Sequence, residues 1–135
     1  MACMGGGLLS TVLTACQPTR YVTGTVESNG ISVLKSEFTY LKKDKPVTRP
    51  FIVVHHENLE YPIYVYRITD DEYSALWMKC THQGYELQAS GDHLYCPGHG
   101  SEFDKRGNVN QGPAEKNLRS FPVSIHGNKI FIELT

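Results

Sequence analysis

Residues 80–84 read Cys-Thr-His-Gln-Gly, and residues 96–101 read Cys-Pro-Gly-His-Gly-Ser. Each segment offers one cysteine sulfur and one histidine nitrogen at close spacing. Together they supply four potential metal ligands, which are Cys80, His82, Cys96 and His99. Thiolate combined with imidazole suits zinc or an iron–sulfur centre rather than calcium or magnesium, which prefer oxygen ligands. The sequence therefore predicts a site for zinc or for iron and sulfide.

The way in which cysteine and histidine are divided between the two loops helps to choose between zinc and an iron–sulfur centre. A common zinc finger pairs two cysteines in one loop and two histidines on a following helix. Here each loop carries one residue of each kind, among glycine and proline and without helical periodicity. Two mixed loops suit a binuclear cluster better, and a structural zinc site with the same four ligands is the alternative.

The two segments, with thirteen residues between His82 and Cys96, resemble the two cluster loops of the Rieske [2Fe–2S] family. Gly112-Pro113-Ala114, followed by Leu118, Phe121 and Val123, resembles the family's third, proline-bearing loop and its return strand. The resemblance implies that Cys80 and Cys96 bind the inner iron, and that His82 and His99 bind the outer iron near the surface. It also implies a carrier of single electrons, with a reduction potential of roughly −150 to +300 mV.

The resemblance extends to residues around the cluster. Ser101 matches a family serine whose hydroxyl bonds a bridging sulfide and raises the potential. Phe103 stands where high-potential members have a tyrosine that donates to a cysteine sulfur, which phenylalanine cannot do. Tyr85 and Gly98 occupy the positions of a disulfide that joins the loops in those members. We therefore expect packing and the prolines, including Pro113, to hold the loops, and a potential below that of the disulfide-bearing, quinol-oxidising members.

Size and charge limit the range of functions. The chain has 135 residues, enough for one domain with a core but not for a second catalytic domain. Rieske oxygenases need a separate mononuclear iron site on such a domain, so we expect an electron-transfer component of an oxidoreductase whose substrate site lies in a partner. The net charge of −1, from 13 basic and 14 acidic residues, indicates neither a nucleic acid nor an anionic membrane as partner. A redox protein is the expected partner.

The expected fold class is all-β: a Rieske-type antiparallel β-sandwich with a small cluster-binding subdomain made of the two metal loops and the proline loop. Aromatic residues lie in alternating stretches that favour strands. We expect hairpins from residues 21–27 and 31–40, from 61–68 and 73–79, and from 121–125 and 130–134, a buried strand at 51–54, and strand-end positions for His55 and His56. The basic segment 42–49 is expected to be a solvated loop rather than a docking patch for an acidic partner.

The N-terminal segment is apolar between Gly5 and Ala15, which suits a secretory signal. Leu13-Thr14-Ala15-Cys16 resembles the lipobox of bacterial lipoproteins, in which the cysteine is lipidated. We expect residues 1–16 to be this segment, 17–20 a linker and 21–135 the Rieske domain, with a lipid anchor at Cys16 in the periplasm or cell envelope. The first seven residues carry no lysine or arginine, so a free thiol at Cys16 is the alternative. The chain would then be a cytoplasmic ferredoxin or a small reductase or oxygenase subunit.

Overall fold

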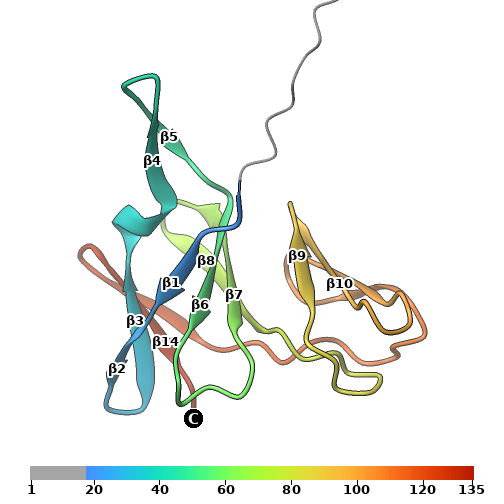
Figure 1. Cartoon of the computed structure of the whole chain (residues 1–135). Coiled ribbons are helices and arrows are strands. Elements are labelled where there is room, and N and C mark those ends of the chain that lie inside the picture. Colours follow the sequence, from blue (N-terminus) through green and yellow to red (C-terminus); the bar gives the residue numbers. More distant parts are fainter. Residues whose placement is uncertain (1–17) are drawn as a thin grey trace, which may run out of the picture.

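Strands dominate the part of the chain that the computed structural model describes, residues 18–135 (Figure 1). The predicted segment 1–16 and the lipidation site Cys16 lie outside these residues. Within residues 18–135, no helix has the length and apolar character needed to cross a membrane. The expected all-β class is confirmed.

Two four-stranded sheets form the part of the molecule that we call the base. The first has the order β1-β6-β7-β8, with the bounds Tyr21–Thr23, Phe51–His55, Ile63–Thr69 and Glu72–Trp77. The second has the order β13-β14-β3-β2, with the bounds Val123–His126, Lys129–Glu133, Gly30–Leu34 and Thr25–Glu27. Apolar side chains of both sheets meet in one core, to which β3, β6, β7 and β14 each give residues that are buried. Each such side chain contributes about 1.5–3 kcal/mol to folding.

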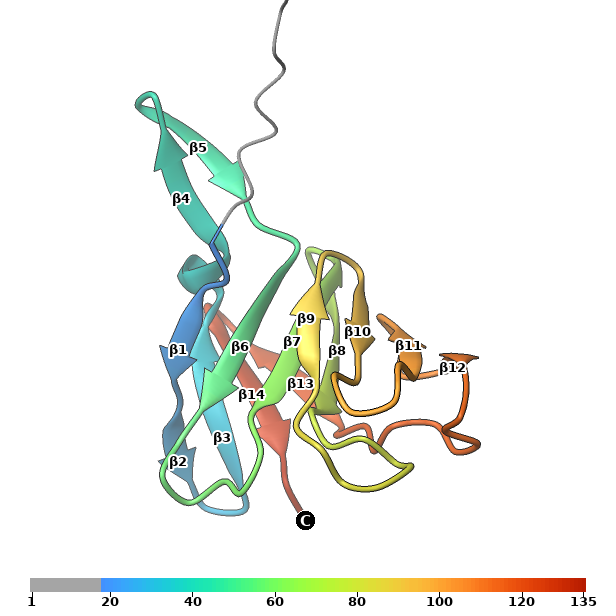
Figure 2. The same ribbon diagram turned by 45° about the vertical axis from the view of Figure 1, so that its right-hand side comes forward.

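A third sheet, which we call the small sheet, lies beside the base (Figures 1 and 2). Its order is β12-β11-β10-β9, with the bounds Val109–Gln111, Glu102–Asp104, His93–Tyr95 and Gln88–Ser90. Successive residues of a strand point to opposite faces. On β6, Ile52 and Val54 accordingly enter the core of the base, while Val53 enters a second core with Leu94 and Phe103 of the small sheet. The sheet β1-β6-β7-β8 is therefore buried on both faces between the other two sheets.

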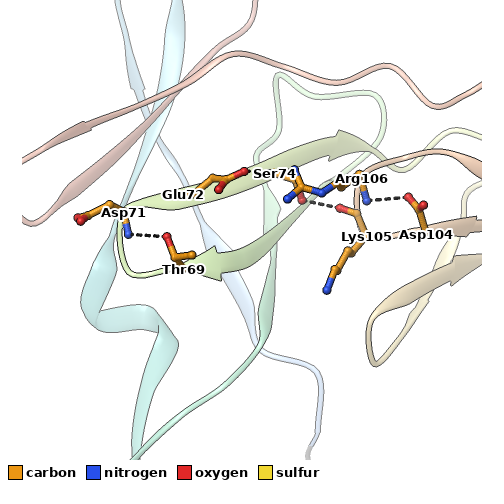
Figure 3. A network of polar contacts seen from close by, with 7 residues as sticks. All are labelled: Thr69, Asp71, Glu72, Ser74, Asp104, Lys105 and Arg106. Carbon is orange, nitrogen blue, oxygen red and sulfur yellow. Dashed lines mark hydrogen bonds and ion pairs between the residues drawn. The ribbon is translucent and has the colours of Figure 1, made fainter.

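Polar contacts also join the base to the turn that follows β11 (Figure 3). Ser74 of β8 donates from its hydroxyl to the carbonyl oxygen of Lys105 at 2.6 Å. Arg106 forms an ion pair with Glu72 at 3.2 Å, and its backbone N–H donates to the carboxylate of Asp104 at 2.8 Å. These contacts fix the small sheet, which carries one of the predicted metal loops, against the edge strand β8.

The basic segment 42–49, expected as a solvated loop, is mostly exposed as expected, but the prediction of a loop was wrong. It forms most of a hairpin of β4 (Thr39–Lys42) and β5 (Lys45–Thr48) that projects away from the small sheet (Figure 1). Lys43 and Asp44 make its two-residue turn with positive φ angles of 50° and 60°, as hairpin turns of this length require. Pro46 is tolerated because this ribbon has only two strands, so a missing N–H can face solvent.

The first predicted hairpin is correct only in part. Residues 21–27 form two strands, because the chain passes between sheets at Gly24: β1 pairs in parallel with β6, and β2 pairs with β3. A Cβ at Gly24 would overlap the side chain of Ile31, so only glycine fits this crossing. The segment 31–40 is also interrupted, by a 3-10 turn η1 (Lys35–Phe38). The buried strand 51–54 and the hairpins β7–β8 and β13–β14 are confirmed, and His55 ends β6 as expected.

Candidate metal centre

The first predicted metal loop begins where β8 ends. A bridge between Lys79 and Glu86 closes its base. The N–H of Cys80 donates to the carbonyl of Tyr85 at 2.8 Å, and the N–H of Gly84 donates to the carbonyl of Cys80 at 2.8 Å. Gly84 has a φ of 76°, a conformation that glycine adopts without strain. The loop is thus a closed turn with Cys80 at its root.

The second loop, between β10 and β11, repeats this construction. The N–H of Cys96 donates to the carbonyl of Ser101 at 2.8 Å, and the N–H of Gly100 donates to the carbonyl of Cys96 at 3.0 Å. Gly100 has a φ of 81°. In both loops the cysteine is therefore at the root of the turn and a glycine four positions later lets the chain reverse.

The four predicted ligands separate into a buried pair and an exposed pair. Cys80 and Cys96 are only 1% and 2% exposed and lie in the same core cluster. His82 and His99 are exposed, and their rings meet edge to face with centroids 5.2 Å apart. Burial, together with the neighbouring thiol of Cys96, raises the pKa of Cys80 above its usual value. A metal bound between these two thiols would favour their deprotonated form, with the protons released to solvent, because its positive charge stabilises the thiolates.

Within residues 18–135, no three side chains of histidine, cysteine, aspartate or glutamate converge as the ligands of one ion. The arrangement is instead one of two pairs, a thiol pair below and an imidazole pair above. A group with two metal positions, each needing one pair from the protein, fits this donor set.

The third, proline-bearing loop is bonded to both metal loops. The N–H of Ala114 donates to the hydroxyl oxygen of Ser101, which is fully buried, at 3.0 Å. The hydroxyl of Thr81 in the first loop donates to the carbonyl of Lys116 at 2.6 Å. Because Ser101 accepts this bond, its own proton is free to donate elsewhere. The contacts made by Thr81 and Lys116 were missed from the sequence, where neither residue belongs to a recognisable pattern.

The two positions that the family resemblance assigns to a disulfide lie in contact. A Cβ built on Gly98 would lie 2.8 Å from Cδ2 of Tyr85, so the tyrosine ring rests directly on this glycine. The same ring approaches His99 with centroids 6.0 Å apart. Tyr85 is about half exposed, whereas Phe103 is fully buried in the core that contains both cysteines. An aromatic ring on a glycine therefore joins the two loops without a covalent bond.

The remaining histidines are not part of this arrangement. His93 lies in β10 and forms an ion pair with Asp92 at 3.6 Å when it is protonated. His55 and His126 hydrogen-bond or contact residues of the base, and His56 accepts from the N–H of Asn58. The expectation of strand-end positions for His55 and His56 agrees with their places, since His55 ends β6 and His56 directly follows it.

Two closed loops, a buried thiol pair and an exposed imidazole pair fit an electron-transfer protein with a binuclear iron–sulfur centre. The family described as "Rieske [2Fe-2S] domain" matches residues 36–122, about two thirds of the chain. The chain belongs to this family, and it carries a Rieske-type [2Fe–2S] cluster for electron transfer. The assignment of the individual ligands remains a prediction.

Two Rieske subunits of cytochrome complexes are similar to this chain in sequence, which agrees with the family assignment. Over 69 residues, or 49% of this chain, the sequence is 35% identical to the mitochondrial cytochrome b-c1 complex Rieske subunit of Schizosaccharomyces pombe, covering 30% of that protein. Over 55 residues, or 39% of this chain, it is 40% identical to the cytochrome b6-f complex iron-sulfur subunit of Synechococcus elongatus, covering 31% of it. The chain thus spans about a third of the length of these relatives.

Among solved structures, the fold is similar to that of the plasma membrane Rieske protein PetC3 from Synechocystis PCC 6803. The TM-score is 0.54 at 26% identity, over 62% of this chain and 86% of that chain. The predicted Rieske-type fold is confirmed by this likeness and by the three sheets described above.

Proposed function

We propose that Cys80 and Cys96 bind the inner iron and His82 and His99 the outer iron, and that electrons enter and leave at the histidine edge. The observation that carries this proposal is the position of two exposed imidazole rings, 5.2 Å apart, on the solvent side of two buried cysteines. When bound, the cluster takes up and releases one electron. The protein serves as a one-electron carrier that docks on a redox partner with this surface.

The surrounding residues have distinct tasks in this proposal. The core residues around the cysteines, including Phe103 and Leu94, exclude water from the thiolates. The backbone of Ala114 holds the Ser101 hydroxyl by donating to its oxygen at 3.0 Å, so that the hydroxyl proton points to another acceptor. A sulfide of the cluster is the acceptor that fits, and this hydrogen bond favours the more negative, reduced state.

We further propose a potential below that of the disulfide-bearing relatives. Tyr85 and Gly98 leave the disulfide positions without cysteines, and Phe103 offers no hydroxyl to a cysteine sulfur. Ser101 is retained as a hydrogen-bond donor, whereas the disulfide and the tyrosine hydroxyl, which both raise the potential in those relatives, are missing. Protein-film voltammetry tests this directly. A value in the lower half of the class range of roughly −150 to +300 mV is expected, and a value near the top contradicts the proposal.

The location proposed for the chain is the cell envelope, with a lipid on Cys16 as anchor. The apolar residues 5–15 and the lipobox-like residues 13–16 support this proposal. The 26% identical Synechocystis protein is described as a plasma membrane Rieske protein. Relatives in the cytochrome complexes work as subunits of larger redox assemblies. A membrane-bound or envelope redox protein is therefore the proposed partner.

Fractionation of cells that express the full chain with labelled palmitate tests the anchor. We expect the wild type and the control Cys3→Ser in the membrane fraction with label, and Cys16→Ser without label and without membrane attachment. An unlabelled wild type in the cytoplasmic fraction contradicts export and anchoring, while leaving the electron carrier intact.

A second candidate is a cytoplasmic Rieske-type ferredoxin or a small reductase or oxygenase subunit. The contact between Tyr85 and Gly98 favours it, because a reducing compartment does not sustain a disulfide and this pair needs none. The same fractionation distinguishes this candidate from the anchored carrier.

A further inference from the structure

A groove of about 500 Å³ lies beside the first metal loop. Its walls include His82 and Thr81 of that loop, together with Trp77, Lys79, Lys116 and Arg119. Lys79 directly precedes Cys80, and the carbonyl of Lys116 accepts the hydrogen bond of Thr81 at 2.6 Å. The groove is thus attached to the loop that we propose as half of the metal site, on the side of His82.

The charge of this groove differs from that of the whole chain. Lys79, Lys116 and Arg119 are three cations, and no carboxylate lies in the lining. Among residues 18–135, six ion pairs form, and none of them includes any of these three side chains. The net charge of the chain is −1. A positive field is therefore concentrated beside the proposed point of electron exit, and no ion pair within residues 18–135 engages these three side chains.

Two of the three cations are held in place by aromatic rings. The guanidinium of Arg119 lies 5.2 Å from the ring centroid of Trp77 and 4.8 Å from that of Phe121, and it donates to the carbonyl of Leu134 at 3.3 Å. The ammonium of Lys79 lies 5.4 Å from the ring centroid of Tyr61 and 5.5 Å from that of Trp77. Cations that are fixed before an anion arrives lose little conformational entropy when they bind it. Lys116 is exposed and free to close on a ligand.

We propose that this groove receives an acidic segment of the redox partner, whose Asp or Glu side chains pair with Lys79, Lys116 and Arg119 and bring the partner's redox centre to His82. The inference rests on the function proposed above and adds the chemistry of the partner. Charge complementarity supports a protein segment, because three separated cations along an open groove match carboxylates spaced along a chain. Such pairing mainly raises the rate of productive encounter and its dependence on salt.

Oxidation of the dithionite-reduced protein by small complexes, followed by stopped-flow absorbance, tests the field of the groove. Hexacyanoferrate(III) takes one electron from the reduced protein and becomes hexacyanoferrate(II). Tris(phenanthroline)cobalt(III) takes one electron in the same way but is a cation. We compare the wild type with the triple variant Lys79→Gln, Lys116→Gln, Arg119→Gln. The matched control is Lys42→Gln, Lys43→Gln, Lys45→Gln, which removes the same charge from the β4–β5 hairpin.

At low salt, the triple variant is expected to react with hexacyanoferrate(III) about tenfold more slowly than the wild type, and no more slowly with the cobalt complex. The wild-type rate with hexacyanoferrate(III) falls as salt is added, and the hairpin control stays close to the wild type. A peptide of six glutamates slows this reaction in the wild type and not in the triple variant. Equal effects of the triple variant and the hairpin control overturn the proposal, as does a peptide without effect on the wild type.

The cluster signal of each variant is recorded before the kinetics. A wild type without a reducible cluster contradicts the proposed function itself, whereas a normal cluster with unchanged kinetics contradicts only the groove. Lys116→Glu is the second variant, because this exposed side chain makes no contact that supports the fold among the described residues. It is expected to slow the oxidation of the reduced protein by hexacyanoferrate(III) relative to the wild type, and an unchanged rate contradicts the proposal.

Discussion

The ring of Tyr85 rests on Gly98, so that a Cβ at residue 98 would lie 2.8 Å from Cδ2 of the ring. This contact joins the first metal loop to the second. The ring is about half exposed, so it can yield to added volume at residue 98 only by moving off the glycine. The contact therefore makes a specific prediction about residue 98.

Gly98→Ala is expected to destabilise the pair of loops by about 1 kcal/mol, the lower end of overpacking costs, because the added methyl group displaces the half-exposed Tyr85 ring. The measurement is the rate of cluster bleaching in urea, which the substitution should accelerate. The double variant Tyr85→Ala, Gly98→Ala has no ring to displace. Adding Gly98→Ala to Tyr85→Ala should therefore accelerate bleaching less than adding it to the wild type. If Gly98→Ala accelerates bleaching equally in the wild type and in Tyr85→Ala, the Tyr85 ring is not what opposes the added methyl group.

Ser101→Ala is expected to lower the reduction potential. If the hydroxyl bond is stronger by about 1.5 kcal/mol in the reduced state, the potential falls by about 60 mV for one electron. Voltammetry measures this shift, and Ser124→Ala on β13 is the control, since the Ser124 hydroxyl hydrogen-bonds to His126 in the base. An unchanged potential in Ser101→Ala would remove the proposed role of the hydroxyl.

Phe103→Tyr is expected to raise the potential, because the added hydroxyl can donate to a cysteine sulfur in the core that Phe103 shares with Cys80 and Cys96. Phe131→Tyr, on β14 of the base, is the control and should leave the potential unchanged. Should the potential fall or stay constant in Phe103→Tyr while the cluster is intact, the residue does not face the sulfur as the family resemblance implies.

Asp104 makes a prediction about pH. Burial raises the pKa of its carboxyl, but hydrogen bonds from Asn108, Arg106 and Gly107 outweigh burial and leave the pKa below its usual value. A carboxyl with a depressed folded-state pKa stabilises the fold above the unfolded-state pKa, about 3.9, and this contribution is lost as pH falls through the folded-state pKa. Asp104→Asn should therefore lower the urea midpoint at pH 7 and lower it less at pH 3.5.

Circular dichroism in urea at both pH values measures these midpoints. Asp44→Asn is the control, since Asn also accepts the positive φ of 60° at this turn position. A difference between wild type and Asp104→Asn that is the same at both pH values would contradict the role of the charged form.

The strands that could be predicted from the sequence are those whose apolar residues either alternate with polar ones or form a continuous run. The strands β6, β7, β8, β13 and β14 follow directly from such patterns, because one or both of their faces enter a core. The segment 42–49 was missed because its charges and Pro46 resemble a loop, while its strands form from the turn at Lys43 and Asp44. The division at Gly24 was missed because it depends on a partner, Ile31, in another strand.

The site was predictable to the extent that its residues are close in sequence. The two Cys and His pairs follow from spacing alone. The bonds from Thr81 to Lys116 and from Ala114 to Ser101, and the ring of Tyr85 on Gly98, join separate loops, and only the folded chain brings them together. The groove likewise combines Lys79 with Lys116 and Arg119, which come from segments about forty residues apart.

The central claim is that Cys80, His82, Cys96 and His99 hold a [2Fe–2S] cluster with two histidines on one iron. The most direct measurement is the low-temperature EPR spectrum of the dithionite-reduced full chain, with iron and sulfide counted, beside the variants His82→Ala and His99→Ala. The account predicts two irons, two sulfides and a rhombic signal with an average g value below that of the free electron, which both variants lose. A colourless, EPR-silent protein with one zinc, or an unchanged signal in either variant, would contradict it.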